Sequence, residues 1–398
     1  MTIYLDHAAT TPLRPEVLEA MLPVLTDGFG NPSSAHGYGR AARAALDDAH
    51  ERMASRLGVE AREIVFTSGG TEANNLAIKG AAWAGKARGH RIVTSAVEHH
   101  AVGHTLRYLE KFGFEVVEVP VDRYGRVDPD HLEAALTDRT ILVSVMLANN
   151  EVGTIQPIAV IADRLRGRKG VLFHVDAVQA APWIDLDLRS LPVDLLSLGA
   201  HKFEGPKGVG ALFVRHGTHV LAQQHGGSQE RHRRAGTENV AGAVGMAVAY
   251  DLSSAERAAT VRRVRRQRER LERAVLAVEG TELTGHPTER LPGLLSIIAR
   301  DTDGASVSVA LDLDGIAASV GSACTTGSTE VSHVLTAMGY PEDEARGALR
   351  LSLGRTTTDA EIDTALEIVP RVLTSMRLGS AAVAADPLGQ GSAAEVPA

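Results

Sequence analysis

Short apolar runs rich in β-branched residues alternate with longer amphipathic stretches over the first 250 residues of the chain. Each run has the length and composition of a buried strand, and the stretches between the runs have the spacing of helices. The expected strands lie at residues 63–66, 91–95, 141–146, 171–176, 195–198 and 210–214. This alternation predicts βαβ units and an α/β fold with a mostly parallel sheet.

The pattern changes after residue 250, where apolar residues recur on one side of a long helical period. These residues are Val261, Val264, Leu271, Val275 and Val278. They predict a helix over residues 253–278 that bridges two domains, with the boundary near Tyr250. We expect an N-terminal segment at 1–14, a large domain at 15–250 and a small domain at 251–378 that includes Cys324. Residues 379–398 are mostly Ala, Gly, Ser and Pro, and this composition predicts a disordered tail.

The composition is that of an ordinary globular enzyme, with 44% apolar and 23% charged residues in 398. No apolar run approaches the roughly 20 residues that a membrane-spanning helix needs. The start, MTIYLDHAATTP, lacks the basic and apolar regions of a secretory signal, so a cytoplasmic location is expected. The net charge of −8 gives no general attraction to nucleic acid.

Polar residues collect at the ends of the expected strands. They are Ser68 to Thr71, Asn149 and Asn150, Asp176, and His201 with Lys202. Because ligands of parallel sheets gather at the carboxyl ends of the strands, we expect these side chains to share one site.

The segment FTSGGTEANN, at 66–75, places two glycines and a threonine between a strand and a helix. Glycines let backbone N–H groups approach an anion, and a helix N-terminus adds partial positive charge. Taken alone, the segment fits a phosphate site and a plain tight turn capped by Thr71 equally well.

Asp176 and Lys202 are the two candidate charged groups of this site. A buried carboxylate needs a partner, which for Asp176 is either a protonated ring nitrogen or a distant arginine. A lysine at a buried cavity mouth has a lowered pKa and can form a Schiff base. Taken alone, the position of Lys202 favours a salt-bridged or anion-binding lysine over a Schiff base. Lys207, beside Pro206, has the pattern of a surface turn residue.

Cys324 is the only cysteine, which excludes an internal disulfide and a multi-cysteine metal site within one chain. It lies in SVGSACTTGSTEVSHVL, at 319–335, among small polar residues. A structural cysteine usually lies in an apolar strand or helix, so this setting favours a reactive thiol over a buried one.

Two further patterns carry less weight. His100 and His104 share a helical face, but no third metal ligand is apparent, so no metal site is expected. The basic run RRVRRQRER, at 262–270, has valines spaced for one buried side, which favours a solvated helix face over an RNA contact.

Ten segments in this order resemble the cysteine desulfurases of the NifS and IscS type, members of the class V aminotransferase family of fold type I pyridoxal phosphate enzymes. They are YLDHAATTP (4–12), GNPSSAHGYGR (30–40), FTSGGTEANN, VEHHAV (97–102), NNEVGTIQP (149–157), HVDAVQ (174–179), HKFEGPKGVGAL (201–212), QERHRRAGTENV (229–240), GSACTTG (321–327) and RLSLGR (350–355). The resemblance covers almost the whole chain. It implies a large, mostly parallel seven-stranded sheet domain and a smaller α+β domain.

The resemblance also implies a role for each matching residue. Lys202 would bind pyridoxal 5'-phosphate as a Schiff base, His99 would stack on the ring and move protons, and Asp176 would hold the ring nitrogen. The other implied cofactor contacts are Asn150 and Gln179 at the phenolic oxygen, and Gly70, Thr71, His201 and Thr237 of the partner subunit at the phosphate. Arg350, assisted by Asn31, would bind the substrate carboxylate, and Cys324 would accept the sulfur.

The chain departs from its relatives at two positions. Gly199 stands where relatives usually have a serine that bonds the phosphate, and losing one bond to a charged group costs about 1.5–3 kcal/mol unless it is replaced. His232 stands where relatives commonly have glycine, which puts the shape of that turn in question.

The implied activity is that of an enzyme that converts L-cysteine to L-alanine and leaves the sulfur on Cys324 as a persulfide. The implied partners are a second copy in a homodimer and a sulfur acceptor, such as an iron–sulfur scaffold or a thiolation enzyme; direct nucleic-acid binding is not expected. The alternatives are a selenocysteine lyase or another class V aminotransferase-like enzyme and, outside enzymes, a sulfur carrier or assembly platform. An aminotransferase has no need of Cys324, and an intact set of Lys202, Asp176 and His99 argues against a non-enzyme.

Overall fold

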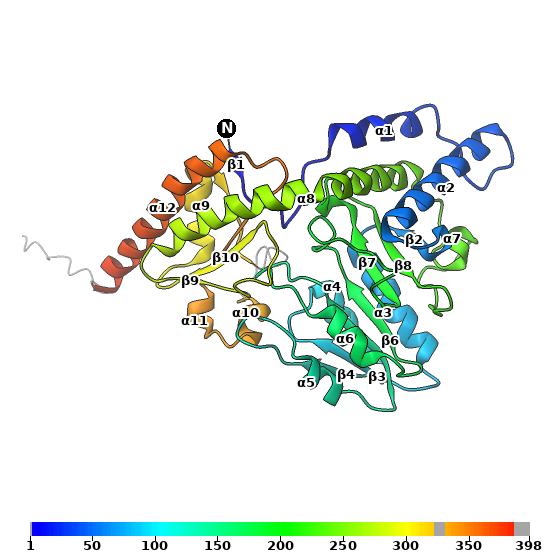
Figure 1. Ribbon diagram of the computed structural model, residues 1–398, viewed down its shortest axis with the longest axis horizontal. Coiled ribbons are helices and arrows are strands. Elements are labelled where there is room, and N and C mark those ends of the chain that lie inside the picture. Colours follow the sequence, from blue (N-terminus) through cyan, green and yellow to red (C-terminus); the bar gives the residue numbers. More distant parts are fainter. Residues whose placement is uncertain (1, 322–330, 386–398) are drawn as a thin grey trace, which may run out of the picture.

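A computed structural model describes residues 2–321 and 331–385, with side chains to residue 377, and shows two domains joined along one long helix (Figure 1). The large domain holds a seven-stranded sheet in the order β2-β8-β7-β6-β5-β3-β4. Its strands are β2 (Ile64–Thr67), β3 (Arg91–Ser95), β4 (Glu115–Val119), β5 (Thr140–Met146), β6 (Leu172–Asp176), β7 (Leu195–Gly199) and β8 (Gly210–Val214). Only β8 runs antiparallel to its neighbours in this sheet, so the predicted α/β fold and mostly parallel sheet are confirmed.

The edge strand β4 was not among the predicted strands. Most of its residues are partly exposed, so EVVEV lacks the continuous apolar run that marks the central strands. Being at an edge does not by itself cause this exposure, because β2 at the opposite edge is fully buried.

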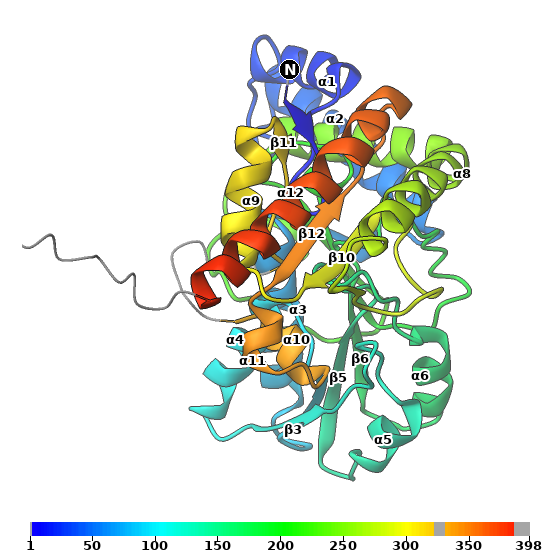
Figure 2. The ribbon, with the colours of Figure 1, turned by 90° about the vertical axis from the view of Figure 1, so that its left-hand side faces the viewer.

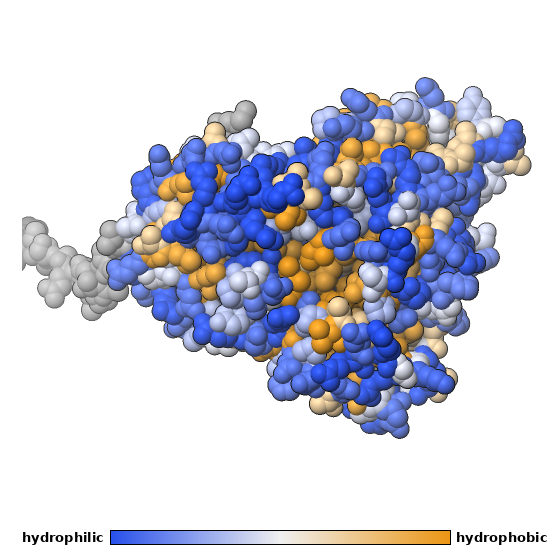
Figure 3. Space-filling model, in the orientation of Figure 1, coloured by the Kyte–Doolittle hydropathy of each residue, from blue (hydrophilic) through white to orange (hydrophobic). Residues whose placement is uncertain are grey.

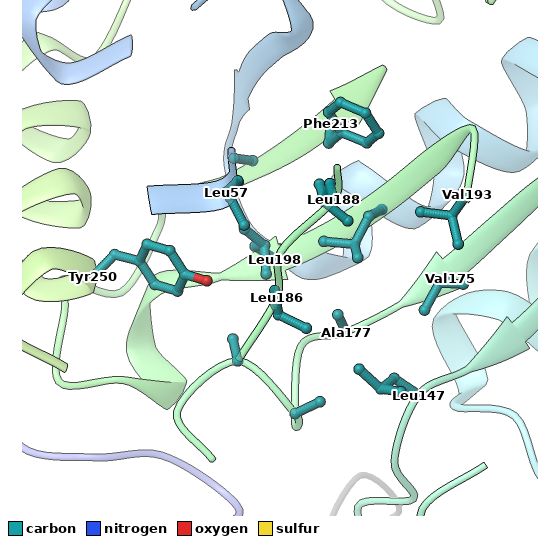
Figure 4. Close-up of a cluster of buried hydrophobic side chains, with 14 of the residues drawn as sticks. Leu57, Leu147, Val175, Ala177, Leu186, Leu188, Val193, Leu198, Phe213 and Tyr250 are labelled. Carbon is teal, nitrogen blue, oxygen red and sulfur yellow. The ribbon is translucent and has the colours of Figure 1, made fainter. Parts of the chain in front are cut away.

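Helices cover both faces of this sheet. On one face α3 (Gly70–Gly85) and α4 (His100–Glu110) bury apolar side chains against the strands, and on the other face α2 (Gly37–Leu57) and α6 (Ile158–Leu165) do so. Figure 4 shows part of the core on the face covered by α2 and α6, where Leu57 and Tyr250 flank Val175, Leu198 and Phe213 of the sheet. The remaining elements of this domain are α1 (Pro15–Leu25), α5 (Pro129–Ala134), α7 (Gln229–His232) and the short 3-10 turns η1 (Ala61–Glu63) and η2 (Ala200–Lys202).

Helix α8 (Val240–Leu276) connects the domains and confirms the long helix predicted over residues 253–278. It begins earlier than predicted because residues 240–250 are buried on nearly every side, which hides the helical period. The helix runs without a break through the predicted boundary at Tyr250 and buries Val264, Leu271 and Val275 in the small-domain core.

The small domain is built on an antiparallel sheet in the order β12-β10-β9, which α9 and α12 cover (Figure 2). Its elements are β9 (Thr281–Leu283), β10 (Leu294–Ala299), β11 (Ile316–Ala317), β12 (Ala348–Ser352), α9 (Gly304–Leu313), α10 (His333–Ala337), α11 (Glu342–Ala345) and α12 (Asp359–Ala385). The N-terminal strand β1 (Ile3–Tyr4) pairs in parallel with β11, so the start of the chain packs with this domain before it crosses to the other.

The disordered tail predicted from Gly379 onward requires a correction. Helix α12 continues past Gly379 to Ala385, and residues 386–398 lie outside the described part of the chain. Alanine has the highest helix propensity of any residue, so an Ala-rich segment without large apolar side chains can still extend a packed helix. Across the described residues, no helix combines the length and the apolar character needed to cross a membrane.

Candidate active site

A cavity of about 340 Å³ lies between the two domains, at the carboxyl ends of the central strands. Large-domain loops, the N-terminal segment and strand β12 all contribute to its wall. Of the residues singled out in the sequence, the wall includes Gly70, Thr71, His99, Asn150, Asp176, Gln179, His201, Lys202 and Arg350. Cys324 lies outside the described residues. Gly321, the last described residue before Cys324, lines this cavity.

The glycine turn after β2 forms a cradle for an anion at one end of the cavity. Gly69 is the N-cap of α3, and no described side chain caps the helix there. A Cβ atom on Gly70 would lie only 2.7 Å from Val178 Cγ2, so the close packing of this turn requires glycine. The open first turn of a helix presents N–H groups to an anion, which supports the phosphate interpretation over a plain Thr-capped turn.

Gly199 borders the same cradle. A Cβ atom at this position would lie 3.3 Å from Val178 Cγ1 and 3.6 Å from the backbone nitrogen of Gly70. A serine would therefore fit with a small adjustment, and its hydroxyl would extend toward the anion cradle.

Asp176 ends strand β6 and is 6% exposed. Its Oδ2 accepts a hydrogen bond from Asn74 Nδ2 at 2.6 Å, and its Oδ1 accepts from the backbone nitrogen of Val178 at 3.0 Å. None of the ion pairs among the described residues involves Asp176, so the distant arginine considered from the sequence is not its partner there. Asn74 Oδ1 is also buried without a hydrogen-bond partner. A cationic donor brought into the cavity would fit this polar end.

Lys202 reaches the cavity from η2, directly after β7. Its Nζ donates to the carbonyl oxygens of Ala8 at 2.5 Å and Ala9 at 2.8 Å. Lys207 is exposed, which confirms the prediction that it is a surface residue. Of the two lysines considered from the sequence, Lys202 is thus the one whose side chain lines this cavity.

Two histidines of the cavity have distinct environments. His99 is the N-cap of α4, and its Nδ1 accepts a hydrogen bond from the backbone nitrogen of Ala101 at 3.1 Å, so the neutral ring carries its proton on Nε2. For His201, burial and then the charges of Lys202 and Lys207 lower the pKa to about 4. His201 is therefore neutral at physiological pH, and either histidine can donate one hydrogen bond.

Arg350 projects from β12 and is 2% exposed. Its Nη1 donates to the carbonyl oxygens of Asn150 at 2.8 Å and Gly321 at 3.3 Å, and its Nη2 donates to Asp6 Oδ1 at 2.9 Å. Its Nε is buried without a hydrogen-bond partner. Of the five N–H groups of a guanidinium, the Nε–H and one N–H of Nη2 are left, and such a pair can bind a carboxylate.

Asn31 and Thr237 do not line the cavity of this chain. Asn31 is exposed on the loop between α1 and α2, where its Oδ1 accepts from the backbone nitrogen of Ser33 at 2.9 Å. This loop lies at the far end of the large domain from the small domain (Figure 1). Thr237 is exposed as well. Neither of these two predicted site residues is thus brought to the cavity within one chain.

The turn at His232 keeps a left-handed backbone even though it lacks glycine. His232 has φ of 65°, after Glu230 at 45° and Arg231 at 56°. The buried Glu230 pairs with the buried His50 at 3.0 Å between Oε2 and Nε2. This buried hydrogen bond anchors a turn whose backbone conformation disfavours side chains.

The histidine pair and the basic run at 262–270 are the two remaining patterns from the sequence. The rings of His100 and His104 lie 4.9 Å apart between centroids, and the described residues contain no group of three or more ligand side chains arranged for a metal. In the basic run, Val264 is buried while Arg262, Arg265 and Arg266 are exposed, as a solvated helix face requires. Arg268 departs from this pattern, because it is buried and pairs with Glu272.

Sequence reasoning missed two residues that hold the site together, Asn74 and Asp6. Asn74 lies within the quoted FTSGGTEANN segment and Asp6 within YLDHAATTP, so each was present in a recognised motif. Their roles depend on partners distant in sequence, and no local pattern indicates such partners.

Residues 3–365 match the model of the class-V aminotransferase family. The chain is 49% identical to cysteine desulfurase IscS of Methanosarcina thermophila, over 94% of this chain and 93% of that protein. It is 47% identical to cysteine desulfurase IscS of Dictyoglomus turgidum, over 94% of this chain and 95% of that protein. Among solved structures, a NifS-like protein with 38% identity superposes with a TM-score of 0.89, over 94% of this chain and all of that one.

Proposed function

Because this chain belongs to the class-V aminotransferase family and, within it, to the cysteine desulfurases, we propose that it converts L-cysteine to L-alanine and transfers the sulfur to Cys324. One observation carries the proposal. Lys202, Asp176 and Arg350 line a single cavity, and so does Gly321, which precedes the only cysteine of the sequence by three residues.

The cavity fits pyridoxal 5'-phosphate. The open N-terminus of α3 suits a phosphate, with Gly70, Thr71 and His201 around it and Thr237 of the partner subunit as a further contact. Asp176, which has an amide partner and no ion pair among the described residues, suits a protonated ring nitrogen. Asn150 and Gln179 suit the phenolic oxygen, His99 the ring face, and Lys202 the covalent bond. When bound, the cofactor supplies a ring that accepts the electrons released at the substrate α-carbon.

The protein's own groups would then act on L-cysteine in turn. Arg350 binds the substrate carboxylate through the N–H groups that Asp6, Asn150 and Gly321 leave available, and Asn31 of the partner subunit assists. The amine of Lys202 removes the α-proton and later returns a proton to the carbon skeleton. The carboxylate of Asp176 keeps the ring nitrogen protonated throughout. His99 exchanges protons at Nε2 with the substrate thiol.

Cys324 completes the reaction as the sulfur acceptor. Its thiolate attacks the substrate sulfur, the carbon–sulfur bond breaks, and a sulfur–sulfur bond forms. L-cysteine and one thiol thereby become L-alanine and one persulfide, with no external oxidant. The persulfide then passes to an acceptor protein, such as an iron–sulfur scaffold or a thiolation enzyme, in the cytoplasm.

A homodimer is part of the proposal. The exposed large apolar side chains include Leu18, Leu22 and Leu25 on α1, with Phe29 and Tyr38 nearby in sequence. Figure 3 shows hydrophobic residues at the surface over this end of the large domain, in addition to a patch near the middle of the same face. A second copy that covers this surface would also bury the exposed Asn31 and Thr237 segments.

The test is an assay of the purified protein with L-cysteine, pyridoxal phosphate and a thiol reductant. We expect a yellow protein that releases alanine and sulfide in equal amounts and carries one persulfide on Cys324 before reductant is added. Release of pyruvate and ammonia, or turnover of L-selenocysteine alone, would contradict the proposal.

A further inference from the structure

Glu204 has an unusual backbone conformation directly beside the active-site lysine. It lies two residues after Lys202 and has φ of 64°, in the left-handed region that disfavours residues with a side chain. It is also 6% exposed, so its carboxylate is buried. A buried residue stays in such a conformation only when its surroundings hold it there, and such residues cluster at functional sites.

Two arginines hold the Glu204 carboxylate. Its Oε2 accepts from Arg14 Nε at 2.7 Å and from Arg355 Nε at 2.6 Å. Arg14 comes from the N-terminal segment just before α1, and Arg355 follows β12, the strand that carries Arg350. One carboxylate therefore connects the lysine loop to the N-terminal segment and to the substrate-binding strand.

The backbone around Glu204 is held by the same N-terminal segment. The Glu204 nitrogen donates to Thr11 Oγ1 at 2.8 Å, and the Glu204 oxygen accepts from the Arg14 nitrogen at 3.1 Å. Thr11 in turn donates to the carbonyl oxygen of His201, through its nitrogen at 3.0 Å and its Oγ1 at 2.7 Å. These bonds fix the loop on both sides of Lys202.

The charged groups also share a cavity wall with Lys202. A second cavity of about 50 Å³ is lined by Lys202 together with Arg14, Glu204, Glu256 and Arg355. Lys202 thus lies in the wall between this small cavity and the larger one. The charge behind the lysine therefore depends on Glu204 and Glu256, which balance Arg14 and Arg355, while Arg257 and His7 also line this cavity. Burial lowers the pKa of His7 to about 4, so this histidine adds no charge at neutral pH.

We propose that Glu204 is a positioning residue. It holds the loop that carries Lys202 in a fixed position relative to the strand that carries Arg350, and it contributes negative charge behind the lysine. The proposal rests on the proposed function, since it assigns Lys202 and Arg350 their roles. Glycine would meet the backbone requirement without strain, so a glutamate at this position is explained by the contacts of its carboxylate. Glu204 acts through Lys202 and does not touch the substrate.

Two substitutions separate the backbone from the carboxylate. Glu204→Gly removes the strain together with the carboxylate, and Glu204→Gln keeps the side-chain length but removes the charge. The matched control is Asp301→Gly, because Asp301 is exposed and has φ of 60° outside the site. If only the turn mattered, Glu204→Gly would behave like Asp301→Gly.

The first measurement is the pH midpoint at which the absorbance of pyridoxal phosphate bound to Lys202 changes. Without the Glu204 anion, Glu256 alone balances Arg14 and Arg355, so one excess positive charge remains behind the lysine and both Glu204 variants should have a lower midpoint. They should also have kcat lower by about tenfold, the effect of a small misplacement of a reacting group. Asp301→Gly should match the wild type in both. A wild-type midpoint and kcat in Glu204→Gly would overturn the proposal.

The second measurement is a double-mutant cycle of Glu204→Gln and Arg355→Gln on the KM for L-cysteine. Because the two residues share one contact, their effects should be less than additive. Additive effects, or a lower melting temperature with an unchanged absorbance midpoint, would reduce Glu204 to a structural role. The absorbance readout does not depend on the amino-acid substrate. A wild-type protein that binds the cofactor but makes no alanine would therefore refute cysteine desulfuration. The absorbance midpoints of the Glu204 variants would still test the role of Glu204.

Discussion

Asn74 Nδ2 donates to Asp176 Oδ2 at 2.6 Å across the floor of the active-site cavity, and the other amide atom of Asn74 has no partner. An amide orients the carboxylate without neutralising it, whereas an arginine would do both. The carboxylate of Asp176 is therefore held in place without a cationic partner among the described residues. This relationship is what makes the end of β6 suitable for a protonated cofactor ring.

Replacing that charge gives the first prediction. Asp176→Asn should leave pyridoxal phosphate bound to Lys202 but lower kcat by about 100-fold or more, the size of effect expected when a preorganised electrostatic group is lost. The cofactor absorbance and the rate of alanine release measure the two effects separately. Turnover close to that of the wild type would mean that the ring nitrogen needs no carboxylate.

Cys324→Ser tests the sulfur acceptor. A hydroxyl does not ionise as a thiol does, so the variant should retain the cofactor and bind L-cysteine but form neither persulfide nor alanine above background. Absorbance titration and mass analysis of the protein check both parts. Alanine release at the wild-type rate would show that sulfur leaves by direct elimination and that Cys324 is a bystander.

Gly199→Ser should tighten cofactor binding. The space beside Gly70 admits a Cβ atom, and a restored hydrogen bond to the phosphate contributes about 1.5 kcal/mol, or about tenfold in Kd. The matched control is Gly199→Ala, which adds the Cβ atom without the hydroxyl and should leave Kd unchanged or weaken binding. Equal Kd values for the serine and alanine variants would show that another group already fills this role.

The left-handed turn at His232 predicts a stabilising substitution. His232→Gly should raise the free energy of unfolding by about 1 kcal/mol, because glycine adopts φ of 65° without the steric cost of a side chain. Urea denaturation at fixed protein concentration measures this free energy. A destabilised variant would indicate that the His232 side chain makes a contact in the assembly that outweighs the strain.

A buried histidine in the large sheet predicts a pH dependence of stability. His174 is fully buried between Ser144 and Ser197, and burial lowers its pKa to about 3. Below the ordinary pKa of 6.5 the unfolded chain binds a proton that the folded chain does not. The stability from this group is therefore present above pH 6.5 and is lost as the pH falls toward 3, by about 1.4 kcal/mol per pH unit.

His174→Gln removes this titration while keeping a polar side chain between the two serines. Between pH 6.5 and 4.5, the unfolding free energy of the variant should depend less steeply on pH than that of the wild type. The difference in slope should correspond to at most one proton bound on unfolding. Denaturant titrations across that range give both slopes. Parallel curves for the two proteins would show that His174 does not cause acid sensitivity.

The sequence by itself determined the central strands and the set of polar residues at their ends. A strand such as Leu172–Asp176 is marked by its apolar run, and the polar residue that ends the run falls at the edge of the sheet where its neighbours also end. Periodicity is a local property, so it placed Asp176 and Lys202 without knowledge of the fold. It failed for β4, whose partial exposure weakens the pattern, and for the first part of α8, which is buried nearly all round.

Only the tertiary structure decided how these residues are supported. Asp6 pairs with Arg350, Asn74 with Asp176, and Arg14 with Glu204, and in each pair the partners are far apart in the sequence. The N-terminal segment reaches both Lys202 and Arg350 because β1 pairs with β11 in the small domain before the chain crosses to the large one. Contacts of this kind depend on how separately formed elements pack together. The apolar faces of these elements could be buried in several different arrangements, so the sequence pattern does not indicate which arrangement forms. The side chains that carry the chemistry are thus fixed by local pattern, whereas their partners are fixed by the way the two domains meet.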